Sequence, residues 1–434
     1  MAAASGHTGR VKRAFVVVLD ACGIGALPDA GQYGDEGSNT LAHVAELAGP
    51  LKLPNLQRLG LGNTTALRGV PSQPGVRTIS VGPGAELPAR LINGRLHAIG
   101  PGKDSTAGHW ALMGVAAPVA QPTYPTGFPP EVVELIGTLS GRGVLCNHTS
   151  NGLDAIADYG EQHLRSGDLI LYTSQDSVLQ LAAHEDSLTA PELHRLCGAI
   201  RAGLPPAHAL GRVIARPFRG APGHFERTGE RRDFALAPPA RSYLDALHDL
   251  AVPVHSVGKA GDLFCGRGID RQHPGATNAE ALAVTSGLLG ELEQGFVLTN
   301  LIETDQLYGH RHDAQGFATA LAQIDVAVGE WLTCLRPGDL MILTADHGVD
   351  PVASHTDHTR EYVPLLAVAC GAPASAEGYR GAGAAETTFS VYPAATGHPR
   401  STGRYEGSMA DVGASSYQWL TGASLPELPG QPFL

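Results

Sequence analysis

The chain has 434 residues, of which 43% are hydrophobic and 17% charged, and its formal net charge is −12. This length favours two domains, and the composition excludes a disordered chain. The negative charge argues against nucleic acid as the main partner, because a phosphate backbone binds to a basic protein face.

Nothing in the sequence indicates export or a membrane partner. The opening residues contain no apolar segment of the signal-peptide type, and no uncharged apolar stretch of about 18 residues occurs. The six cysteines include no CxxC pair and suggest no disulfide framework. We therefore expect a cytoplasmic protein.

Four apolar runs of strand length end in polar residues and a loop. They open the segments 14–25, 169–177, 295–305 and 340–348. Continuous apolar runs are typical of parallel strands that are covered on both faces. Because ligands bind beyond the carboxyl ends of such strands, we expect Asp20, Asp305 and Asp346 to converge at one sheet edge.

Helical patterns fill the gaps between these runs. Residues 38–49 begin with a Ser/Asn cap signal and end at Gly49. Residues 314–335 carry one apolar stripe formed by Phe317, Leu321, Ile324, Val328 and Trp331. The alternation predicts an α/β fold, with a mostly parallel sheet and helices on both faces.

Two Pro-rich stretches, 117–131 and 236–242, have the composition of hinges. The segment between them has strand and helix patterns of its own and is too long for an unstructured loop. We therefore expect a catalytic core made of residues 1–118 and 238–434, with a smaller α/β cap domain inserted at 119–237. A Gly/Ala/Ser-rich stretch at 371–403 is expected to be a surface insertion.

Aspartates and histidines cluster beyond the predicted strands. Carboxylates with imidazoles suit divalent ions such as Zn²⁺ or Mn²⁺, and six ligands suffice for two ions with open positions. Each residue taken alone also fits a loop or cap role, and His312 and His355 are expected to be solvated loop histidines. The six candidate ligands are Asp20, Asp305, His310, Asp346, His347 and His358.

The stretch "GPGKDSTAGHWALMG" at 100–114 places Ser105 and Thr106 before an apolar helix. Backbone N–H groups and the dipole favour a phosphate at a helix N-terminus. A metal ion beside such a hydroxyl would make it a nucleophile. A plain capping role is the alternative, and the stretch is no P-loop.

Several cations suit phosphate binding, because an Arg fork binds phosphate bidentately. For each of these cations, the alternative is an exposed surface position that binds no ligand. These cations are Arg212, Arg216, Arg227, Arg231, Arg232 and Lys259. The residues by themselves indicate a two-metal phosphoryl-transfer enzyme of α/β fold.

An ordered set of motifs then resembles one family. The chain contains "RAFVVVLDACGIGALPDA", "GKDSTAGHW", "TSQDSVLQLAAHE", "GRVIARPF", "RTGERRD", "SVGK", "DQLYGHRHD" and "TADHGVDP" followed by "TDHTRE". This set resembles the bacterial phosphopentomutases of the alkaline phosphatase superfamily, over most of the chain. The resemblance implies an alkaline-phosphatase-like core with an inserted cap.

The resemblance also implies roles for particular residues. Asp20, Asp346 and His347 would hold one ion together with the nucleophile, and the other three candidate ligands would hold the second ion, both ions usually being Mn²⁺. Ser105 would be the phosphorylated hydroxyl where the family normally has Thr, with Thr106 as the alternative. Substrate contacts would come from Ser174, Asp176, Arg212, Arg227 and Lys259.

The implied reaction interconverts ribose 1-phosphate and ribose 5-phosphate, or the 2-deoxyribose equivalents. It would proceed through a phosphoenzyme and a 1,5-bisphosphate, and a sugar bisphosphate would act as activator. The alternatives are a phosphatase or phosphoglycerate mutase of the same superfamily, or a non-catalytic sugar-phosphate-binding protein. A monomer is favoured. Ala111 stands where the family usually has Glu, and Glu303 and Thr304 replace the usual Asp-Phe.

Overall fold

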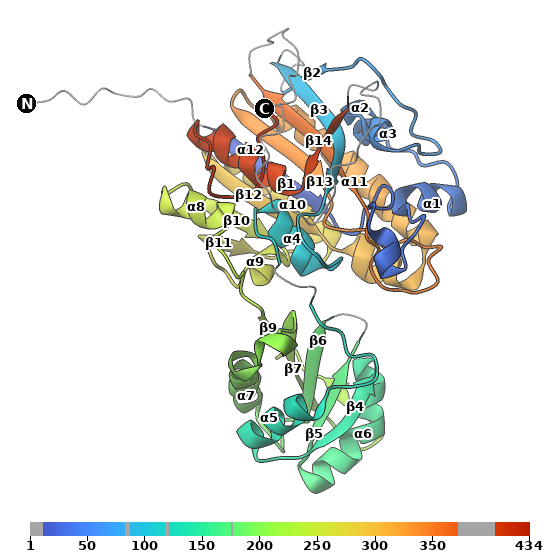
Figure 1. Ribbon diagram of the computed structural model, residues 1–434, viewed down its shortest axis with the longest axis vertical. Helices are drawn as coiled ribbons and strands as arrows, with labels where there is room; N and C mark the ends of the chain where they lie inside the picture. Colours follow the sequence, from blue (N-terminus) through green and yellow to red (C-terminus); the bar gives the residue numbers. More distant parts are fainter. Residues whose placement is uncertain (1–11, 83–86, 118–120, 175–176, 372–403) are drawn as a thin grey trace, which may run out of the picture.

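The computed structural model describes residues 12–82, 87–117, 121–174, 177–371 and 404–434. Two sheets divide it into a larger and a smaller body (Figure 1). We call the larger body, with the nine-stranded sheet, the core, and the smaller body, with the six-stranded sheet, the cap. Within the described ranges, no helix combines the length and apolar character needed to cross a bilayer.

The core sheet is mostly parallel, as predicted. Its order is β11-β10-β12-β1-β13-β14-β3-β15, with β2 paired to β3, and the strands from β11 to β13 are all parallel. Every residue of β1, β12 and β13 is buried, which explains their continuous apolar runs. The bounds are β1 Arg13–Leu19, β2 Thr78–Val81, β3 Leu87–His97, β10 Val254–Val257, β11 Arg271–His273, β12 Gly295–Leu301, β13 Asp339–Thr344, β14 Val363–Cys370 and β15 Tyr405–Ser408.

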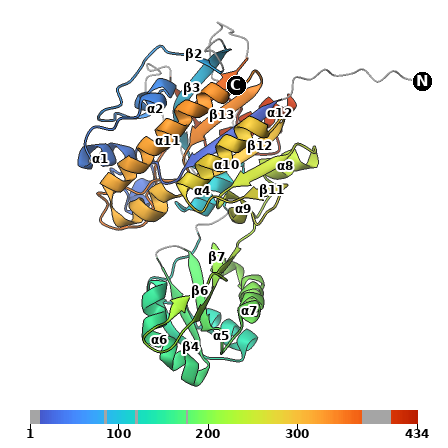
Figure 2. The same cartoon turned by 180° about the vertical axis from the view of Figure 1, so that it is seen from behind.

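Helices cover both faces of this sheet, which confirms the predicted fold class. One face carries α10 and α11, which lie in front in Figure 2, and the other carries α4 and α12, which lie in front in Figure 1. The bounds are α1 Thr40–Leu47, α2 Pro54–Leu59, α3 Leu61–Thr64, α4 Ser105–Leu112, α8 Tyr243–Asp249, α9 Ala260–Leu263, α10 Asn278–Glu291, α11 Ala314–Cys334 and α12 Ala410–Thr421.

Two of the predicted helices have clear sequence causes. The predicted apolar stripe of α11 is buried along its whole length. The side chain of Asn39 caps α1 by accepting a hydrogen bond from the backbone N–H of Ala42, as the Ser/Asn signal predicted. The helix ends at Leu47, just before Gly49, whose φ of +96° suits only glycine.

The cap sheet has the order β4-β5-β6-β7-β8, with β9 paired to β7. A buried cluster joins α5 and α7 to one face, and a second cluster joins α6 to the other. All its elements lie inside the segment 119–237, while the exact domain boundaries stay a prediction. They are α5 Pro130–Ser140, β4 Val144–Thr149, α6 Gly152–Ser166, β5 Leu169–Thr173, β6 Val178–His184, α7 Ala190–Gly203, β7 Arg212–Arg219, β8 Glu226–Arg227 and β9 Arg232–Ala235.

The strand register of the core brings three loops to one edge. Leu19 of β1 lies beside Leu301 of β12, and Val18 lies beside Thr344 of β13. The loops that carry the three predicted aspartates therefore leave the sheet at the same level. Most of the predicted insertion, residues 372–403, lies outside the described residues.

The stripe of α11 gives a stability prediction. Ile324→Ala removes a fully buried side chain and should lower the free energy of unfolding of the core by about 2–5 kcal/mol, because it leaves a cavity. Val326 is 61% exposed on the same helix, so Val326→Ala should change that free energy by no more than about 0.5 kcal/mol. Urea denaturation measures both, and equal losses would contradict the packing of α11.

Candidate metal centre

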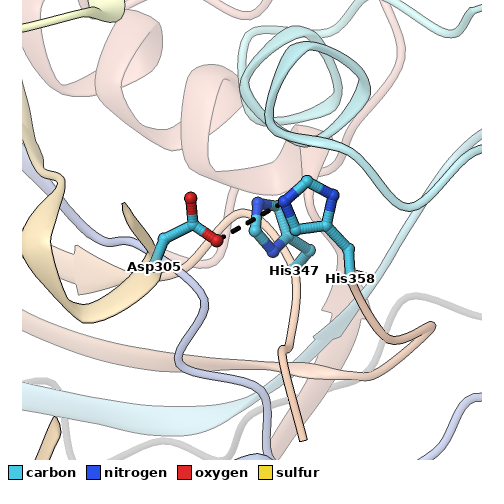
Figure 3. Close-up of side chains that lie close together, drawn as sticks. All are labelled: Asp305, His347 and His358. Carbon is cyan, nitrogen blue, oxygen red and sulfur yellow. Dashed lines mark ion pairs between the residues drawn. The ribbon is translucent and has the colours of Figure 1, made fainter. Parts of the chain in front are cut away.

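Six candidate ligands from four segments meet at the carboxyl edge of the core sheet. Ligand atoms of Asp20, Asp346 and His347 all lie within 4.8 Å of one another, and those of Asp305, His347 and His358 do so as well. Figure 3 shows the second group, with Asp305 and His358 joined as an ion pair. His347 belongs to both groups and therefore links them.

His310 completes the second group. It lies in the short 3-10 helix Gly309–Arg311, and its Nε2 is 3.5 Å from Oδ1 of Asp305. Nε2 of His358 lies 3.4 Å from the same oxygen. Nδ1 of His310 donates to the carbonyl of Thr356 at 2.6 Å, which turns Nε2 toward the cluster.

His312 and His355, which we expected to be solvated loop histidines, are half-buried and form hydrogen bonds outside the two candidate groups. Nε2 of His312 donates to the carbonyl oxygen of His355, and Nε2 of His355 bonds Asp35.

Three carboxylate oxygens in the cluster are buried and have no hydrogen-bond donor among the described residues. They are Oδ1 of Asp20, Oδ1 of Asp305 and Oδ2 of Asp346. Imidazole nitrogens stand 3.2–3.5 Å from these oxygens, outside hydrogen-bond geometry. Leaving buried charge without donors is costly, and cations would remove that cost. A set of oxygen and imidazole ligands therefore fits a pair of divalent ions such as Mn²⁺ or Zn²⁺.

Strong electrostatic coupling marks the same residues. Burial and the neighbouring Asp346 raise the pKa of Asp20 to about 6, although Lys259 opposes them. Burial lowers the pKa of His347, but Asp346, Asp305 and Asp20 outweigh it and raise that pKa to about 10. Burial raises the pKa of Asp346, yet His347 and His109 hold it below its usual range. Without metal, a proton on His347 therefore supplies part of the missing positive charge.

Two residues that support the carboxylates were missed in the sequence. His109 is buried on α4, with Nδ1 2.9 Å from the carbonyl of Ser105 and 3.2 Å from Oδ2 of Asp346. Asn300 donates from Nδ2 to Oδ2 of Asp20 at 2.9 Å. Such second partners fix the orientation of metal ligands. His109 could have been found, since it lies one helical turn after Ser105, but Asn300 looks like any strand residue.

The two candidate hydroxyls differ in their surroundings. Ser105 is the first residue of α4, and its Oγ lies 3.1 Å from Nε2 of His347. Lys259 donates from Nζ to the same Oγ at 2.8 Å. Thr106 is buried, and its side chain makes no hydrogen bond within the described part of the chain. The geometry therefore favours Ser105.

Gly108 lets α4 approach the cluster. A Cβ atom at this position would lie 2.3 Å from the backbone oxygen of Asp346, which is closer than side chains tolerate. Any larger residue would push Ser105 away from the candidate ligands. The "GHW" motif thus combines a close approach with the support that His109 gives to Asp346.

Lys259 lies in the core beside the nucleophile candidate. It follows β10, and its Nζ is 2.5 Å from Oδ2 of Asp20. Burial lowers the pKa of Lys259, but Asp20, Asp305 and Asp346 outweigh it and raise that pKa above its usual value. A charged ammonium therefore stands between Asp20 and Ser105.

The remaining sequence candidates belong to the cap. Ser174 follows β5, Arg212 begins β7, and Arg227 lies on β8, while Asp176 is outside the described residues. Arg212 lies 3.6 Å from Asp233, so part of its charge is compensated.

A cationic group surrounds a tyrosine on the cap sheet. Tyr172 Oη is buried and has no hydrogen-bond partner among the residues described. Oη of Tyr172 lies near Nη2 of Arg227. A Cβ atom added to Gly152 would lie 2.4 Å from each of these two atoms. Burial lowers the pKa of Arg216, and Arg231 and Arg227 lower it further, which indicates excess positive charge. Such a group of cations suits an anion, and no sequence pattern pointed to Tyr172.

Residues of the cap lie against the core helix that follows Lys259. Sγ of Cys265, just beyond α9, lies 3.5 Å from the carbonyl of Ala235 at the end of β9. Burial raises the pKa of Asp262 on α9, and Arg212 and Arg231 act in the opposite direction. The start of β7 is therefore close to the segment that holds Lys259.

Comparisons with known proteins agree on one family. A model described as the metalloenzyme superfamily matches residues 12–417. The chain is 44% identical over 405 residues to the phosphopentomutase of Anaeromyxobacter sp. (strain K), covering 93% of this chain and 98% of that protein. It is also 44% identical over 357 residues to the phosphopentomutase of Caldanaerobacter subterraneus subsp. tengcongensis, covering 82% of this chain and 87% of that protein.

Among solved structures, the phosphoglycerate mutase of Leishmania mexicana aligns with 98% of each chain. The identity is 13% and the TM-score 0.44, a likeness too weak to inform the function.

The raised pKa of His347 predicts that ion binding depends on pH. A metal ligand must be neutral, so each ion that binds His347 releases its proton. Between about pH 7 and 8.5, the association constant for Mn²⁺ should rise about tenfold per pH unit. Isothermal titration in buffers of different ionisation enthalpy measures this, and His248→Gln, an exposed histidine paired with Asp270, is the control. A binding constant independent of pH would contradict the assignment of His347.

Proposed function

The chain belongs to the phosphopentomutase family of the metalloenzyme superfamily, and on that premise we propose that it interconverts ribose 1-phosphate and ribose 5-phosphate, together with the 2-deoxyribose equivalents. The reaction passes through a phosphoenzyme on Ser105 and a 1,5-bisphosphate. One observation carries the proposal: Oγ of Ser105 lies between Lys259 and His347, at the edge of two carboxylate–imidazole groups.

Two divalent ions, most suitably Mn²⁺, belong to this proposal. Asp20, Asp346 and His347 hold the first, and the second is held by the remaining candidate ligands, Asp305, His310 and His358. When bound, such ions neutralise the charge that develops on the transferring phosphoryl group. The three buried oxygens that lack donors support this assignment.

Ser105 and Lys259 perform the transfer itself. The bond between phosphorus and Oγ breaks as the bond to a sugar oxygen forms, and the proton of the sugar hydroxyl ends on Oγ. Lys259, 2.8 Å from Oγ, stabilises the negative charge on this leaving oxygen. In the second half of the reaction, Ser105 takes the other phosphoryl from the bisphosphate. A sugar 1,5-bisphosphate therefore also loads the unphosphorylated enzyme as activator.

The cap holds the phosphate that does not react. Arg227 and Arg212 bind it, Tyr172 adds a neutral hydrogen bond, and Ser174 and Asp176 orient the sugar hydroxyls. Fixing one end of the sugar brings the other end to Ser105, which supplies the positioning part of the barrier. The cap also limits the access of water, which would otherwise hydrolyse the phosphoserine.

Two further assignments complete the proposal. Every proposed site residue comes from one chain, so we propose that the protein acts as a monomer. The cytoplasm is the proposed location, because all six cysteines are free thiols, as a reducing compartment keeps them.

Ser105→Ala tests the nucleophile. It should abolish the phosphoenzyme and lower turnover of ribose 1-phosphate in Mn²⁺ by at least about 1000-fold, because Ser105 is the hydroxyl that Lys259 bonds within the described residues. Thr106→Ala is the control and should keep the phosphoenzyme. Full turnover in the serine variant together with loss in the threonine variant would move the nucleophile to Thr106. Release of inorganic phosphate faster than formation of ribose 5-phosphate would indicate a phosphatase instead.

Tyr172→Phe tests the proposed phosphate contacts of the cap. Losing one hydrogen bond to a charged group should raise the KM for ribose 5-phosphate about tenfold or more. Thermal stability should not fall, since Oη has no partner in the described structure. Tyr159→Phe, which removes a hydroxyl bonded to His148 on the cap surface, should leave KM unchanged. An unaltered KM in the Tyr172 variant would exclude Tyr172 from the phosphate site.

A further inference from the structure

Glu361 is a buried carboxylate that the proposed reaction does not use. It is only 3% exposed, and it accepts four hydrogen bonds. Oε2 accepts from the backbone N–H of Gly25 and of Thr40, both at 3.0 Å. Oε1 accepts from the hydroxyls of Thr40 and Thr359, both at 2.6 Å. None of these donors is a cation, and burial raises the pKa of this carboxyl group.

The carboxylate lies between two glycines that belong to the ligand loops. A Cβ on Gly23 would lie 2.4 Å from Oε2, and a Cβ on Gly348 would lie 2.3 Å from Oε1. Gly23 follows Asp20 by three residues, and Gly348 follows His347 directly. Glu361 therefore fills the space where the backbones of the loops after β1 and β13 meet.

Backbone pairing ties the same segments together around Glu361. Gly348 and Thr359 exchange hydrogen bonds of 3.2 and 2.7 Å in an antiparallel bridge. Glu361 itself forms a bridge with Ala26, further along the loop that begins at Asp20. The side chain thus joins the loop of Asp20 to the loop of Asp346 and His347, which otherwise come from separate strands.

We infer that Glu361 is a positioning residue for the first ion site. It sets the separation between Asp20 and the pair Asp346–His347 without touching the ion. This inference rests on the proposed function in so far as those three residues hold an ion. The second site is held differently, because His310 is oriented by the carbonyl of Thr356. Because His347 belongs to both groups and Thr359 adjoins His358, loss of Glu361 should weaken both ions, the first more than the second.

Glu361→Gln is the direct test. The amide keeps the size of the side chain but removes its charge. The hydroxyls of Thr40 and Thr359, which now donate to Oε1, would have to turn and accept from the new NH₂ group, and these neutral bonds are weaker. Titration with Mn²⁺, followed by electron paramagnetic resonance of the free ion, should show two bound ions in the wild type. In the variant one ion should bind at least about tenfold more weakly, and the other should be weakened clearly less.

Asp325→Asn supplies a matched control. Asp325 is 2% exposed on α11 and accepts from the backbone N–H groups of Leu56 and Asn55 at 2.7 and 3.2 Å, again without a cation. Loss of this carboxylate should lower thermal stability and leave both ions bound as in the wild type. Comparing the two variants separates a general loss of stability from an unequal weakening of the two ions.

Three results would overturn the inference. They are unchanged binding of both ions in Glu361→Gln, equal weakening of both ions, and the same weakening in Asp325→Asn. If Glu361→Gln does not fold, Thr40→Val removes one donor and should weaken the same ion more than the other. A wild type that binds two ions but fails to convert ribose 1-phosphate would refute the proposed function and leave this inference standing.

Discussion

Burial of carboxylates without hydrogen-bond donors is the constraint on which the rest of the site depends. Oxygens of Asp20, Asp305 and Asp346 converge at the carboxyl edge of the buried parallel strands β1, β12 and β13, and three of these oxygens have no donor among the described residues. A protein gains nothing in stability from such an arrangement by itself. It becomes favourable when cations fill the space, and the raised pKa of His347 shows how strongly positive charge is attracted there.

The neighbouring structure serves to hold these groups at short range. Gly108 allows α4 to reach the backbone of Asp346, which brings Ser105 and His109 to the cluster. Gly23 and Gly348 leave room for Glu361, which joins the loops that follow β1 and β13. At each of these places another segment packs closely against the chain because a glycine leaves room for it. The ammonium of Lys259 reaches the nucleophile from the turn after β10, the strand that pairs with β12 on the side away from β1.

Much of the core could be predicted from the sequence, because its signals are local. Continuous apolar runs marked β1, β12 and β13, and the stripe from Phe317 to Trp331 marked α11. The candidate ligands follow these strands directly, so the rule for parallel sheets was enough to expect Asp20, Asp305 and Asp346 together. The clusters of Asp and His after the strands supplied His310 and His358 as further candidates.

What the sequence did not reveal depends on contacts between distant segments. Asn300, Tyr172 and Glu361 are ordinary residues of strands or loops until the fold brings their partners to them. Lys259 was expected among the substrate contacts, and only the structure places its ammonium against both Asp20 and Ser105. The choice between Ser105 and Thr106 likewise rests on which hydroxyl faces the cluster, and adjacent positions of a chain carry no such information.

Anomalous diffraction from a crystal grown with Mn²⁺, collected at the manganese absorption edge, tests the central claim most directly. Two peaks are expected, one contacting Asp20, Asp346 and His347, and the other contacting Asp305, His310 and His358. A single peak, or peaks elsewhere in the molecule, would contradict the account of these buried carboxylates as a two-ion site.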